Sequence, residues 1–358
     1  MGARAAPSPV TGAMPASRRT ATTLRDVADA VGVHPSTVSR VLRKDGTQVA
    51  TDALARRITE AAAALGYRPN PVALSLRTGR SSALGLLLPD VTNPVFTRVL
   101  RGLEDRLASA GYTTIVANTD YSYDREAQVV EALLARNVDG LVFATGRRND
   151  PLVRRVLEAG VPVALINQAL PEGEANCIVT DDELGVRLAL EHLASLGHRR
   201  VGHLAGPEEL DPAMRRRHAF KELAPRFGLD PDPTLLATTA FYSEEEGARA
   251  TAQLLASAPG CTAILCGNDV LALGCYEVLA ARGIACPAAM SVIGFNDMPL
   301  VGRLHPPLTT LRVPYYAMGR EAGEVLLKQI QSEELPPPRL SVHAVELVVR
   351  GSTAPPRS

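Results

Sequence analysis

The sequence predicts an α/β protein with a small three-helix head at its N-terminus, a hinge helix, and a core of two doubly wound parallel-sheet lobes. Three observations lead to this prediction. The apolar spacing is helical throughout residues 23–65, short strand-like runs alternate with amphipathic helices in the remainder, and a length of 358 residues suits two or three domains. Hydrophobic residues make up 46% and charged residues 21% of the chain, so most of it is expected to fold.

Charge is distributed unevenly along the chain, although the formal net charge is +0. Residues 1–80 contain 12 Lys and Arg against 5 Asp and Glu, a net charge of +7, so the remainder carries −7. A positive head on a negative body is typical of a protein that presents one end to a nucleic acid.

The composition also argues against several classes of protein. Residues 1–20 are expected to form a disordered tail, and whether Met14 is the true start stays open. The chain shows no signal-peptide core and no apolar run near the ~18 residues that cross a bilayer, so a cytoplasmic protein without a membrane partner is expected. The five cysteines form no Cys-x-x-Cys pair, which favours buried free thiols. The seven histidines are scattered, so no metal site and no cofactor are expected.

The head, residues 21–67, is predicted to contain a helix-turn-helix. Leu24, Val27, Ala28 and Val31 share one helical face, and Gly32 supplies the positive φ that a tight turn needs. Further along the head, Pro35 suits the first position of a second helix, and a third helix is expected over residues 52–65.

The second helix carries the candidate DNA-reading surface. Val38, Val41 and Leu42 are expected to point inward, with Thr37 adding a hydroxyl in the first turn. Five residues then face outward: Pro35, Ser36, Ser39, Arg40 and Arg43. Short groups at the helix N-terminus followed by long cations are what a helix in the major groove requires. An amphipathic helical hairpin without a DNA role is the alternative.

Residues 68–80 predict a hinge helix and linker. Asn70 is placed to cap the helix and Gly79 to end it. A helix below ~12 residues is marginal alone, so its folding would be coupled to binding a partner chain and DNA. Leu76, flanked by Arg77 and Arg80, suits an apolar wedge in the minor groove. A plain interdomain linker is the alternative.

Residues 81–350 are predicted to form two lobes with a ligand cleft between them. The expected strands are 83–88, 113–117, 140–144, 163–166, 201–204, 263–266, 291–295 and 341–349, and the expected helices include 96–110, 126–137, 184–196, 244–258, 270–282 and 318–331. We assign residues 81–181 and 297–331 to the first lobe, 182–296 and 332–350 to the second, and 351–358 to a tail. Ligands bind beyond the carboxyl ends of such strands, which places the site in the cleft.

Specific motifs resemble the LacI/GalR (lactose-repressor) family. They are Asp26-Val27-Ala28, Gly32-Val33, Thr37-Val38-Ser39-Arg40-Val41, Leu65-Gly66-Tyr67-Arg68-Pro69-Asn70, Thr92-Asn93-Pro94-Val95-Phe96, Val138-Asp139-Gly140, residues 192–200, Asn268-Asp269, Gly294-Phe295-Asn296-Asp297 and residues 306–310. The resemblance implies a type I periplasmic-binding-protein-like core. It also implies a homodimer that binds a palindromic double-stranded operator and a small-molecule effector that changes operator affinity.

The resemblance also implies which residues bind. The DNA-contacting set is Thr23, Pro35, Ser36, Thr37, Ser39, Arg40, Arg43, Asn70, Ala73, Leu76 and Arg77, and the effector-contacting set is Asp90, Phe96, Asn167, Arg216, Asn268 and Asn296. Many relatives have Asp where this chain has Asn296, which offers one acceptor oxygen and an NH₂ donor instead of a carboxylate.

Two of the effector candidates have structural alternatives. Arg216 stands in the run Arg215–His218, which is typical of a solvated helix face, and Asn268 equally suits the N-cap of the following helix.

The predicted function is a sequence-specific transcriptional regulator, a repressor controlled by a sugar or related metabolite. No short signature of nucleotide, hydrolase or zinc-protease chemistry occurs, so no enzyme activity is expected. A small-molecule receptor whose head contacts another protein, and an enzyme built on the core, are the rival hypotheses. The sequence leaves open the effector, the operator, and whether the effector loosens or tightens DNA binding.

Overall fold

The structure is a computed structural model that describes residues 22–43, 51–68, 75, 79–171, 173–332 and 337–357. It divides into two compact units, Met1–Gly79 and Arg80–Ser358. The predicted tail 1–20, with Met14, and the hinge residues Asn70, Ala73, Leu76 and Arg77 lie outside the described residues.

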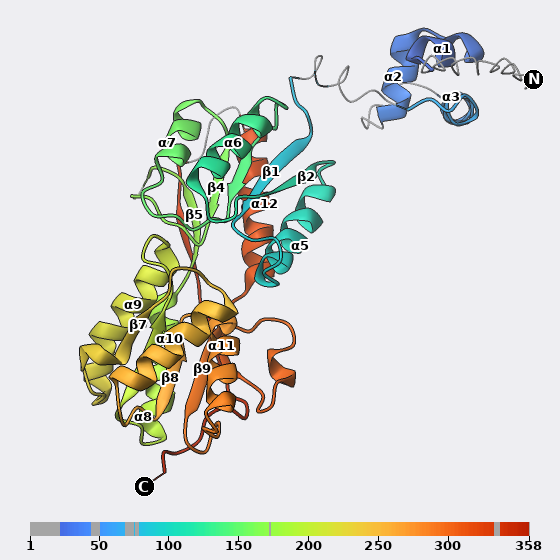
Figure 1. Cartoon of the computed structure of the whole chain (residues 1–358). Coiled ribbons are helices and arrows are strands. Elements are labelled where there is room, and N and C mark those ends of the chain that lie inside the picture. Colours follow the sequence, from blue (N-terminus) through green and yellow to red (C-terminus); the bar gives the residue numbers. More distant parts are fainter. Residues whose placement is uncertain are drawn as a thin grey trace, which may run out of the picture. The chain divides into compact units, whose positions relative to one another are not determined.

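The first unit contains the three predicted helices: α1 (Leu24–Val31), α2 (Pro35–Arg43) and α3 (Asp52–Ala64) (Figure 1). They enclose one small core of Val27, Ala28, Val31, Val38, Ile58 and Ala62, against which Val41 and Leu42 pack half-buried. The helical spacing seen in the sequence therefore corresponds to a real buried face.

Local sequence signals set the ends of α1. The Thr23 hydroxyl accepts a hydrogen bond from the Asp26 backbone N–H, and the Asp26 carboxylate accepts one from the Thr23 N–H at 2.7 Å, which completes a capping box. Gly32 ends the helix at φ 74°, a left-handed conformation that glycine adopts without steric cost. The turn between α1 and α2 is thus encoded by its own residues.

The second unit is built on two six-stranded sheets, one in each lobe (Figure 1). The first sheet has the order β11-β5-β4-β3-β1-β2 and is parallel throughout. Its strands are β1 (Ala83–Leu88), β2 (Thr113–Asn118), β3 (Leu141–Phe143), β4 (Val163–Ile166), β5 (Asn176–Thr180) and β11 (Leu340–His343). The helices of this lobe are α5 (Val95–Ala108), α6 (Tyr123–Leu134), α7 (Pro151–Glu158) and α12 (Tyr315–Gln331).

The second sheet has the order β12-β10-β9-β8-β6-β7, and only β12 runs antiparallel to its neighbour. Its strands are β6 (Val201–Ala205), β7 (Leu236–Thr238), β8 (Ala263–Cys266), β9 (Ser291–Asn296), β10 (Thr309–Arg312) and β12 (Glu346–Val348). This lobe also holds α8 (Asp182–Ser195), α9 (Asp211–Leu223), α10 (Glu244–Ser257) and α11 (Asp269–Ala281), and the short 3₁₀ turns Ala224–Phe227, Pro233–Leu235 and Val301–Arg303.

Both sheets reverse their strand order at one point, between β1 and β3 and between β6 and β8. The helices on the two sides of such a point diverge, which opens a crevice beyond the carboxyl ends of the strands. The predicted doubly wound architecture is confirmed, and it directs the carboxyl-end loops of both lobes toward the cleft.

Several C-terminal segments belong to a different lobe from the one predicted. β10 lies beside β9 in the second lobe, so residues 297–312 do not belong to the first lobe as predicted. The predicted single strand 341–349 is two strands, of which β11 pairs with β5 in the first lobe and β12 pairs with β10 in the second. Lobe membership depends on which distant strand each segment pairs with, and that partner leaves no local pattern.

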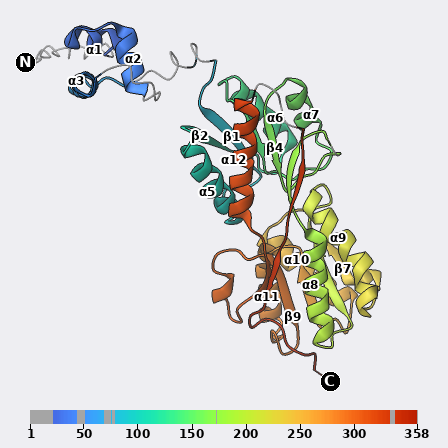
Figure 2. The same ribbon diagram turned by 180° about the vertical axis from the view of Figure 1, so that it is seen from behind.

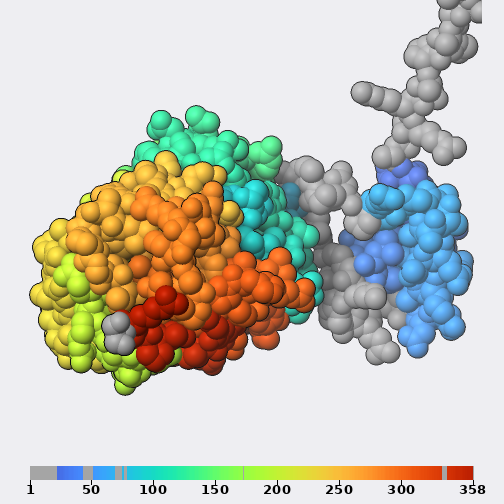
Figure 3. All heavy atoms as spheres, turned by 60° about the horizontal axis from the view of Figure 1, so that its bottom comes forward, coloured from blue at the N-terminus to red at the C-terminus, as the bar shows by residue number. Residues whose placement is uncertain are grey.

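The predicted C-terminal tail 351–358 is also wrong for its first half, residues 351–354. Ser352 is fully buried, and its hydroxyl donates to the Val292 carbonyl oxygen at 2.6 Å and accepts from the Thr309 N–H at 2.8 Å. Figure 3 shows the C-terminal residues, in deep red, seated against the second lobe. The segment 351–354 therefore packs against this lobe, with Ser352 in its interior.

Among the described residues, no helix combines the length and apolar character needed to cross a membrane. Within the same ranges, no three His, Cys, Asp or Glu side chains gather as metal ligands would. All five cysteines are free thiols, four of them buried and Cys286 half-buried.

Helices α5 and α12 cross with glycine at the contact, and Figures 1 and 2 both show them side by side in the first lobe. A Cβ atom on Gly319 would lie 2.1 Å from the Val99 carbonyl oxygen, and one on Gly102 would lie 2.1 Å from the Tyr316 carbonyl oxygen. Because both contacts are with backbone, neither can be relieved by turning a side chain.

We expect Gly319→Ala to lower the free energy of unfolding by roughly 1–3 kcal/mol, because the methyl group forces the helices apart. Gly323→Ala, one turn later, is the matched control, since its Cβ would meet only Arg106 and Leu103 side-chain atoms at 3.2–3.3 Å. Both substitutions gain the same helix propensity, so urea denaturation of the pair isolates the clash. Equal stability of the two variants would contradict the close crossing.

Candidate functional sites

The outward face of α2 presents a polar residue and a cation. Ser36 and Arg40 are exposed, while Pro35, Thr37 and Ser39 are half-buried. The Arg40 Nε donates to the Ser36 carbonyl oxygen at 3.3 Å, so the guanidinium lies along the exposed side of the helix. The structure thus leaves Ser36 and Arg40 accessible as predicted, and it describes no side chain for Arg43.

His34 has a role that the sequence analysis missed. Its Nδ1 lies 2.8 Å from the Ser36 hydroxyl and accepts from the Ser36 backbone N–H at 3.2 Å. It therefore occupies an N–H group in the first turn of α2, as an N-terminal capping side chain does. The sequence signal that could have predicted this cap is the polar residue directly before Pro35.

Thr23 is exposed, but its hydroxyl serves the capping box of α1, donating to the Asp26 carboxylate at 2.9 Å. Other cations of the head lie on α1 and α3: Arg25, Arg56 and Arg57 are exposed, and Arg57 also donates to the Val31 carbonyl oxygen at 3.4 Å. The positive charge predicted from the sequence is therefore displayed on the surface of the folded head.

Five of the six predicted effector residues line one small cavity in the second unit. Phe96, Asn167, Arg216, Asn268 and Asn296 surround about 50 Å³ of space. Phe96 comes from the first turn of α5, Asn167 follows β4, Asn268 follows β8, Asn296 ends β9, and Arg216 lies on α9. Positions that span 200 residues of sequence converge here because the carboxyl ends of both sheets meet at the cleft.

Arg216 is buried, which excludes the solvated-face alternative. Its Nε donates to the Asp182 carboxylate at 2.7 Å, its Nη1 donates to the Gly267 carbonyl oxygen at 2.6 Å, and its guanidinium lies 3.6 Å from the Phe295 ring centroid. Burial alone would lower the pKa of Arg216, but Asp182 more than compensates and raises that pKa above its ordinary value. A fixed positive charge therefore lines the cavity.

Asn268 is indeed an N-cap, since its side-chain oxygen accepts from the Leu271 N–H at 2.9 Å. It also lines the cavity, so capping orients it there. Asn167, at φ 58°, has a side-chain oxygen that is buried without a hydrogen-bond partner in the described part of the chain. That oxygen is free to accept a hydrogen bond from a ligand.

The sequence analysis missed two tyrosines of this cavity. The Tyr315 hydroxyl donates to the Asn296 side-chain oxygen at 2.9 Å, and the Tyr242 hydroxyl is buried with no partner among the described residues. Burial raises the pKa of each tyrosine to about 12, so both hydroxyls stay protonated and can donate. Both tyrosines lie near the start of a helix, and that position alone does not predict a ligand contact.

Asp90 lines a neighbouring cavity of about 660 Å³ that shares Asn93 and Tyr242 with the first. Its carboxylate accepts from the Thr92 N–H at 2.8 Å and from the Thr92 hydroxyl at 2.7 Å. The structure therefore does not bring Asp90 together with the other five predicted effector residues.

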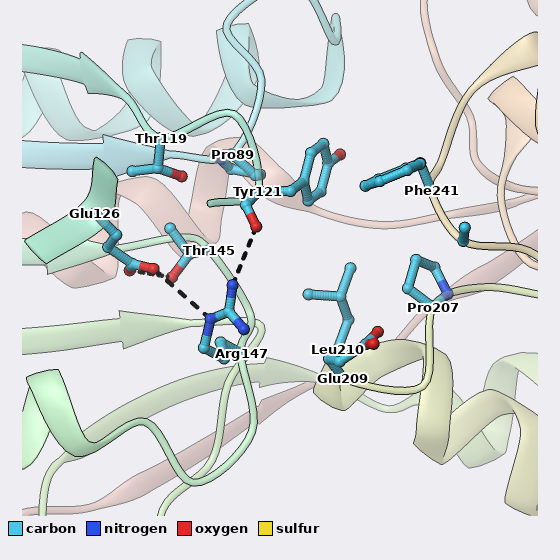
Figure 4. A pocket seen from close by; sticks show the side chains of 11 residues that line it. Pro89, Thr119, Tyr121, Glu126, Thr145, Arg147, Pro207, Glu209, Leu210 and Phe241 are labelled. Carbon is cyan, nitrogen blue, oxygen red and sulfur yellow. Dashed lines mark hydrogen bonds and ion pairs between the residues drawn. The ribbon is translucent and has the colours of Figure 1, made fainter. Parts of the chain in front are cut away.

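A further cavity, of about 250 Å³, adjoins the first one and was not predicted (Figure 4). The two cavities share Pro89, Tyr121, Thr145 and Leu210. Glu126, from α6, accepts a hydrogen bond from the Thr145 hydroxyl at 2.8 Å, and its other oxygen lies 3.9 Å from the Arg147 Nε. Burial raises the pKa of Glu126 to about 7, although the Thr145 hydrogen bond and Arg147 oppose the shift.

A helix-turn-helix head with an exposed serine and arginine on its second helix, in the same chain as a two-lobed receptor core with a polar cleft, defines a DNA-binding transcriptional regulator. Residues 23–70 match the family model for bacterial regulatory proteins of the lacI family, and residues 190–353 match a periplasmic binding protein-like domain. The chain belongs to the lacI family of bacterial regulatory proteins.

Individual relatives agree along almost the whole chain. An uncharacterized HTH-type transcriptional regulator in the aml 5′ region of Streptomyces limosus is 37% identical over 92% of this chain and 94% of its own. The lac repressor dimer bound to operator and the anti-inducer ONPF is 27% identical with a TM-score of 0.83, over 94% of this chain and 100% of that one. The transcriptional regulator CelR in complex with cellobiose is 28% identical with a TM-score of 0.71, over 92% and 99%.

Proposed function

We propose that this regulator binds a palindromic operator as a homodimer, represses transcription, and changes its operator affinity when a sugar or related metabolite enters the cleft. One observation carries the proposal: the same chain has an exposed surface with Ser36 and Arg40 on α2 and a buried polar cavity around Arg216. The similarity to the lac repressor dimer on its operator and to a cellobiose-bound regulator supports it.

In the head, Pro35, Ser36 and Arg40 are the proposed base readers. An arginine that reaches the major groove can donate two hydrogen bonds to a guanine edge, while the shorter residues allow the helix N-terminus to approach the bases. Thr23, Thr37, Ser39 and Arg43 are proposed to contact the backbone around them. These contacts fix the register of the helix on the duplex without selecting a sequence.

The hinge positions Asn70, Ala73, Leu76 and Arg77 are proposed to form the second DNA contact. Paired hinge helices from two subunits would press Leu76 into the minor groove between the half-sites, with Arg77 on the phosphates. The bend that such a wedge produces would make sequence-dependent deformability part of recognition.

In the core, Phe96, Asn167, Arg216, Asn268 and Asn296 are proposed to hold the effector, with Asp90 at the edge of the site. Their amide and guanidinium groups offer donors and one unpaired acceptor, which suits a ligand rich in hydroxyl groups. Closure of the lobes on the effector is proposed to move the first lobe and thereby stabilise or melt the hinge helices. By linkage, effector and operator must change each other's affinity by the same factor.

We expect Arg40→Ala to weaken binding to the specific operator by roughly 1–3 kcal/mol while leaving non-specific binding nearly unchanged, because a base contact is lost. Arg25→Ala is the matched control, an exposed arginine on α1. Fluorescence anisotropy with a selected operator and a random duplex measures both affinities. An equal loss on both duplexes would show that Arg40 contacts only the backbone.

The test of the whole proposal is selection of a preferred duplex from random sequence, followed by footprinting with and without candidate metabolites. A steep fall in affinity with rising salt is expected, because DNA binding releases condensed counterions. A small-molecule receptor whose head binds another protein would select no duplex. If none of the metabolites changes operator affinity, the proposed switch is refuted.

We further propose that the core binds its effector without turning it over, and that the protein acts in the cytoplasm at the nucleoid. Recovery of an unchanged effector after incubation with the purified protein is the expected result. Conversion of the bound metabolite would instead favour an enzyme built on the α/β core.

A further inference from the structure

We propose that the cavity lined by Thr119, Glu126, Thr145 and Arg147 is a second subsite of the effector cleft, and that the effector is an uncharged two-ring sugar with one ring in each cavity. This inference rests on the proposed function of the cleft, and it adds the size and charge of the ligand. It names a part of the cleft that contains none of the six effector residues predicted from the sequence.

The first argument is space. The cavity around Arg216 holds about 50 Å³, whereas ligand sites usually hold ~300–1,000 Å³. The adjoining cavity adds about 250 Å³ and shares four lining residues with the first, so the two adjoin and their volumes combine. A ligand confined to the cavity of the five predicted residues would leave the larger part of this volume empty.

The second argument is the set of polar groups that the protein leaves without partners. Thr119 is 1% exposed, and its hydroxyl has no hydrogen-bond partner among the described residues. The Arg147 Nε is likewise unpartnered there, since 3.9 Å to the Glu126 oxygen exceeds the ~3.2 Å of a hydrogen bond. Burying a polar group without a partner is unfavourable, so a ligand that supplies the partners would recover that cost.

The chemistry of these groups matches hydroxyl groups. A hydroxyl both donates and accepts, so neighbouring hydroxyls of one ring could donate to Glu126 and accept from Arg147 and Thr119. Figure 4 shows Glu126, Thr145 and Arg147 gathered on one side of the cavity. The Arg147 Nη2 already donates to the Tyr121 carbonyl oxygen at 3.1 Å, which fixes the guanidinium in place for such a contact.

Two aromatic side chains supply an apolar surface. The rings of Tyr121 and Phe241 are 6.1 Å apart at an interplanar angle of 60°, and both line the cavity. Phe241 is 53% exposed, so one face of its ring is open to a ligand in the cavity. The C–H face of a sugar ring would cover it while the hydroxyl groups at the ring edge reach Glu126 and Arg147.

The charged residues that line this cavity favour an uncharged ligand. Two carboxyl groups, Glu126 and Glu209, line the cavity together with a single cation, Arg147, among the residues that the structure places there. Arg147 already lies beside Glu126 and over the Tyr123 ring at 5.7 Å. A phosphorylated or carboxylated ring in this cavity would therefore meet Glu209, and Glu126 whenever it is ionised, beside one cation that is already engaged.

The second subsite also spans the two lobes. Thr119, Glu126 and Arg147 belong to the first lobe, and Leu210 and Phe241 belong to the second. Beside the cavity, the Arg148 N–H donates to the Glu209 carbonyl oxygen at 2.9 Å, and Arg147 and Leu210 form a backbone bridge. A ring bound here would add contacts across the same seam, so the two-ring ligand would favour closure more strongly than either ring alone.

The test is calorimetric titration of the full-length protein with glucose, galactose, maltose, cellobiose, lactose and melibiose. At least one disaccharide is expected to bind tenfold or more tightly than either monosaccharide. Phe241→Ala and Thr119→Val are expected to weaken that disaccharide at least tenfold and threefold, respectively. Thr114→Val is the matched control, because the Thr114 hydroxyl on β2 is also unpartnered but lines none of the three cleft cavities.

Three outcomes would overturn the subsite: a monosaccharide that binds as tightly as every disaccharide, Thr119→Val and Thr114→Val changing the affinity equally, or none of the six sugars binding. Operator binding is measured on the same preparations. Intact operator binding together with any of these outcomes would refute the two-ring ligand while leaving the DNA-binding function in place. Circular dichroism of each variant excludes misfolding as the cause of lost binding.

Discussion

Arg216→Ala is expected to lower the free energy of unfolding of the core by roughly 3–5 kcal/mol. The side chains of Arg216 and Asp182 are only 4% and 3% exposed, and they are joined at 2.7 Å. Removing the guanidinium leaves the Asp182 carboxylate buried without its cation, and it also removes the donor to the Gly267 carbonyl oxygen. Chemical denaturation followed by circular dichroism measures the loss.

Arg217→Ala is the matched control for this prediction. Arg217 is the next residue on α9 and pairs with Glu208, whose side chain is 63% exposed. Because solvent screens such a pair, its loss is expected to cost no more than ~1 kcal/mol. Combining Arg216→Met with Asp182→Asn should recover much of the stability, since no buried charge is then left alone. Equal stability of the Arg216→Ala and Arg217→Ala variants would show that the buried pair contributes nothing.

Glu126→Gln is expected to change how stability depends on pH. The ordinary pKa of a glutamate, 4.5, applies in the unfolded chain, whereas burial raises the pKa of Glu126 to about 7 in the folded state. Between these values the folded state binds the proton more tightly, so the contribution of Glu126 to stability falls as pH rises from about 4.5 to about 7 and then levels off. At ~1.4 kcal/mol per pKa unit, the fall attributable to Glu126 is about 3 kcal/mol.

Glutamine has the same shape, can still accept from the Thr145 hydroxyl, and has no proton to release. The Gln variant should therefore gain about 3 kcal/mol over the natural protein between pH 4.5 and pH 8. Denaturation at a series of pH values gives the difference curve, in which other buried acids such as Asp269 cancel. Glu131→Gln, on the same helix with a side chain 65% exposed, is the matched control. A flat curve for Glu126→Gln would mean that this carboxyl ionises normally.

Local patterns in the sequence predicted a large part of this protein. The helical spacing of Val27, Ala28 and Val31, the turn at Gly32 and the proline at the start of α2 define the head, because each acts through neighbours within four residues. The apolar runs of β1, β4, β8 and β9 were recognisable for the same reason, since both faces of these strands are buried. The three-residue strand β7 carried too little pattern to be predicted.

The cleft was predicted only in part. Phe96, Asn167, Arg216, Asn268 and Asn296 were identified by their resemblance to a known family, and the structure brings them to one cavity. The neighbouring cavity was missed because Thr119, Glu126, Thr145 and Arg147 form no motif. They meet only because β1, β2 and β3 are adjacent in the sheet and direct the loops that follow them to one edge.

The sequence by itself determined the helix-turn-helix, the alternation of strands and helices, the polarised charge and the family. Only the tertiary structure decided that Arg216 is buried against Asp182, that Ser352 belongs to a core, and that β10 and β11 lie in opposite lobes. The physical reason is how far apart in the sequence the interacting residues lie. Helix caps, turns and amphipathic faces depend on residues a few positions apart, whereas burial and strand pairing depend on segments separated by tens of residues to more than a hundred.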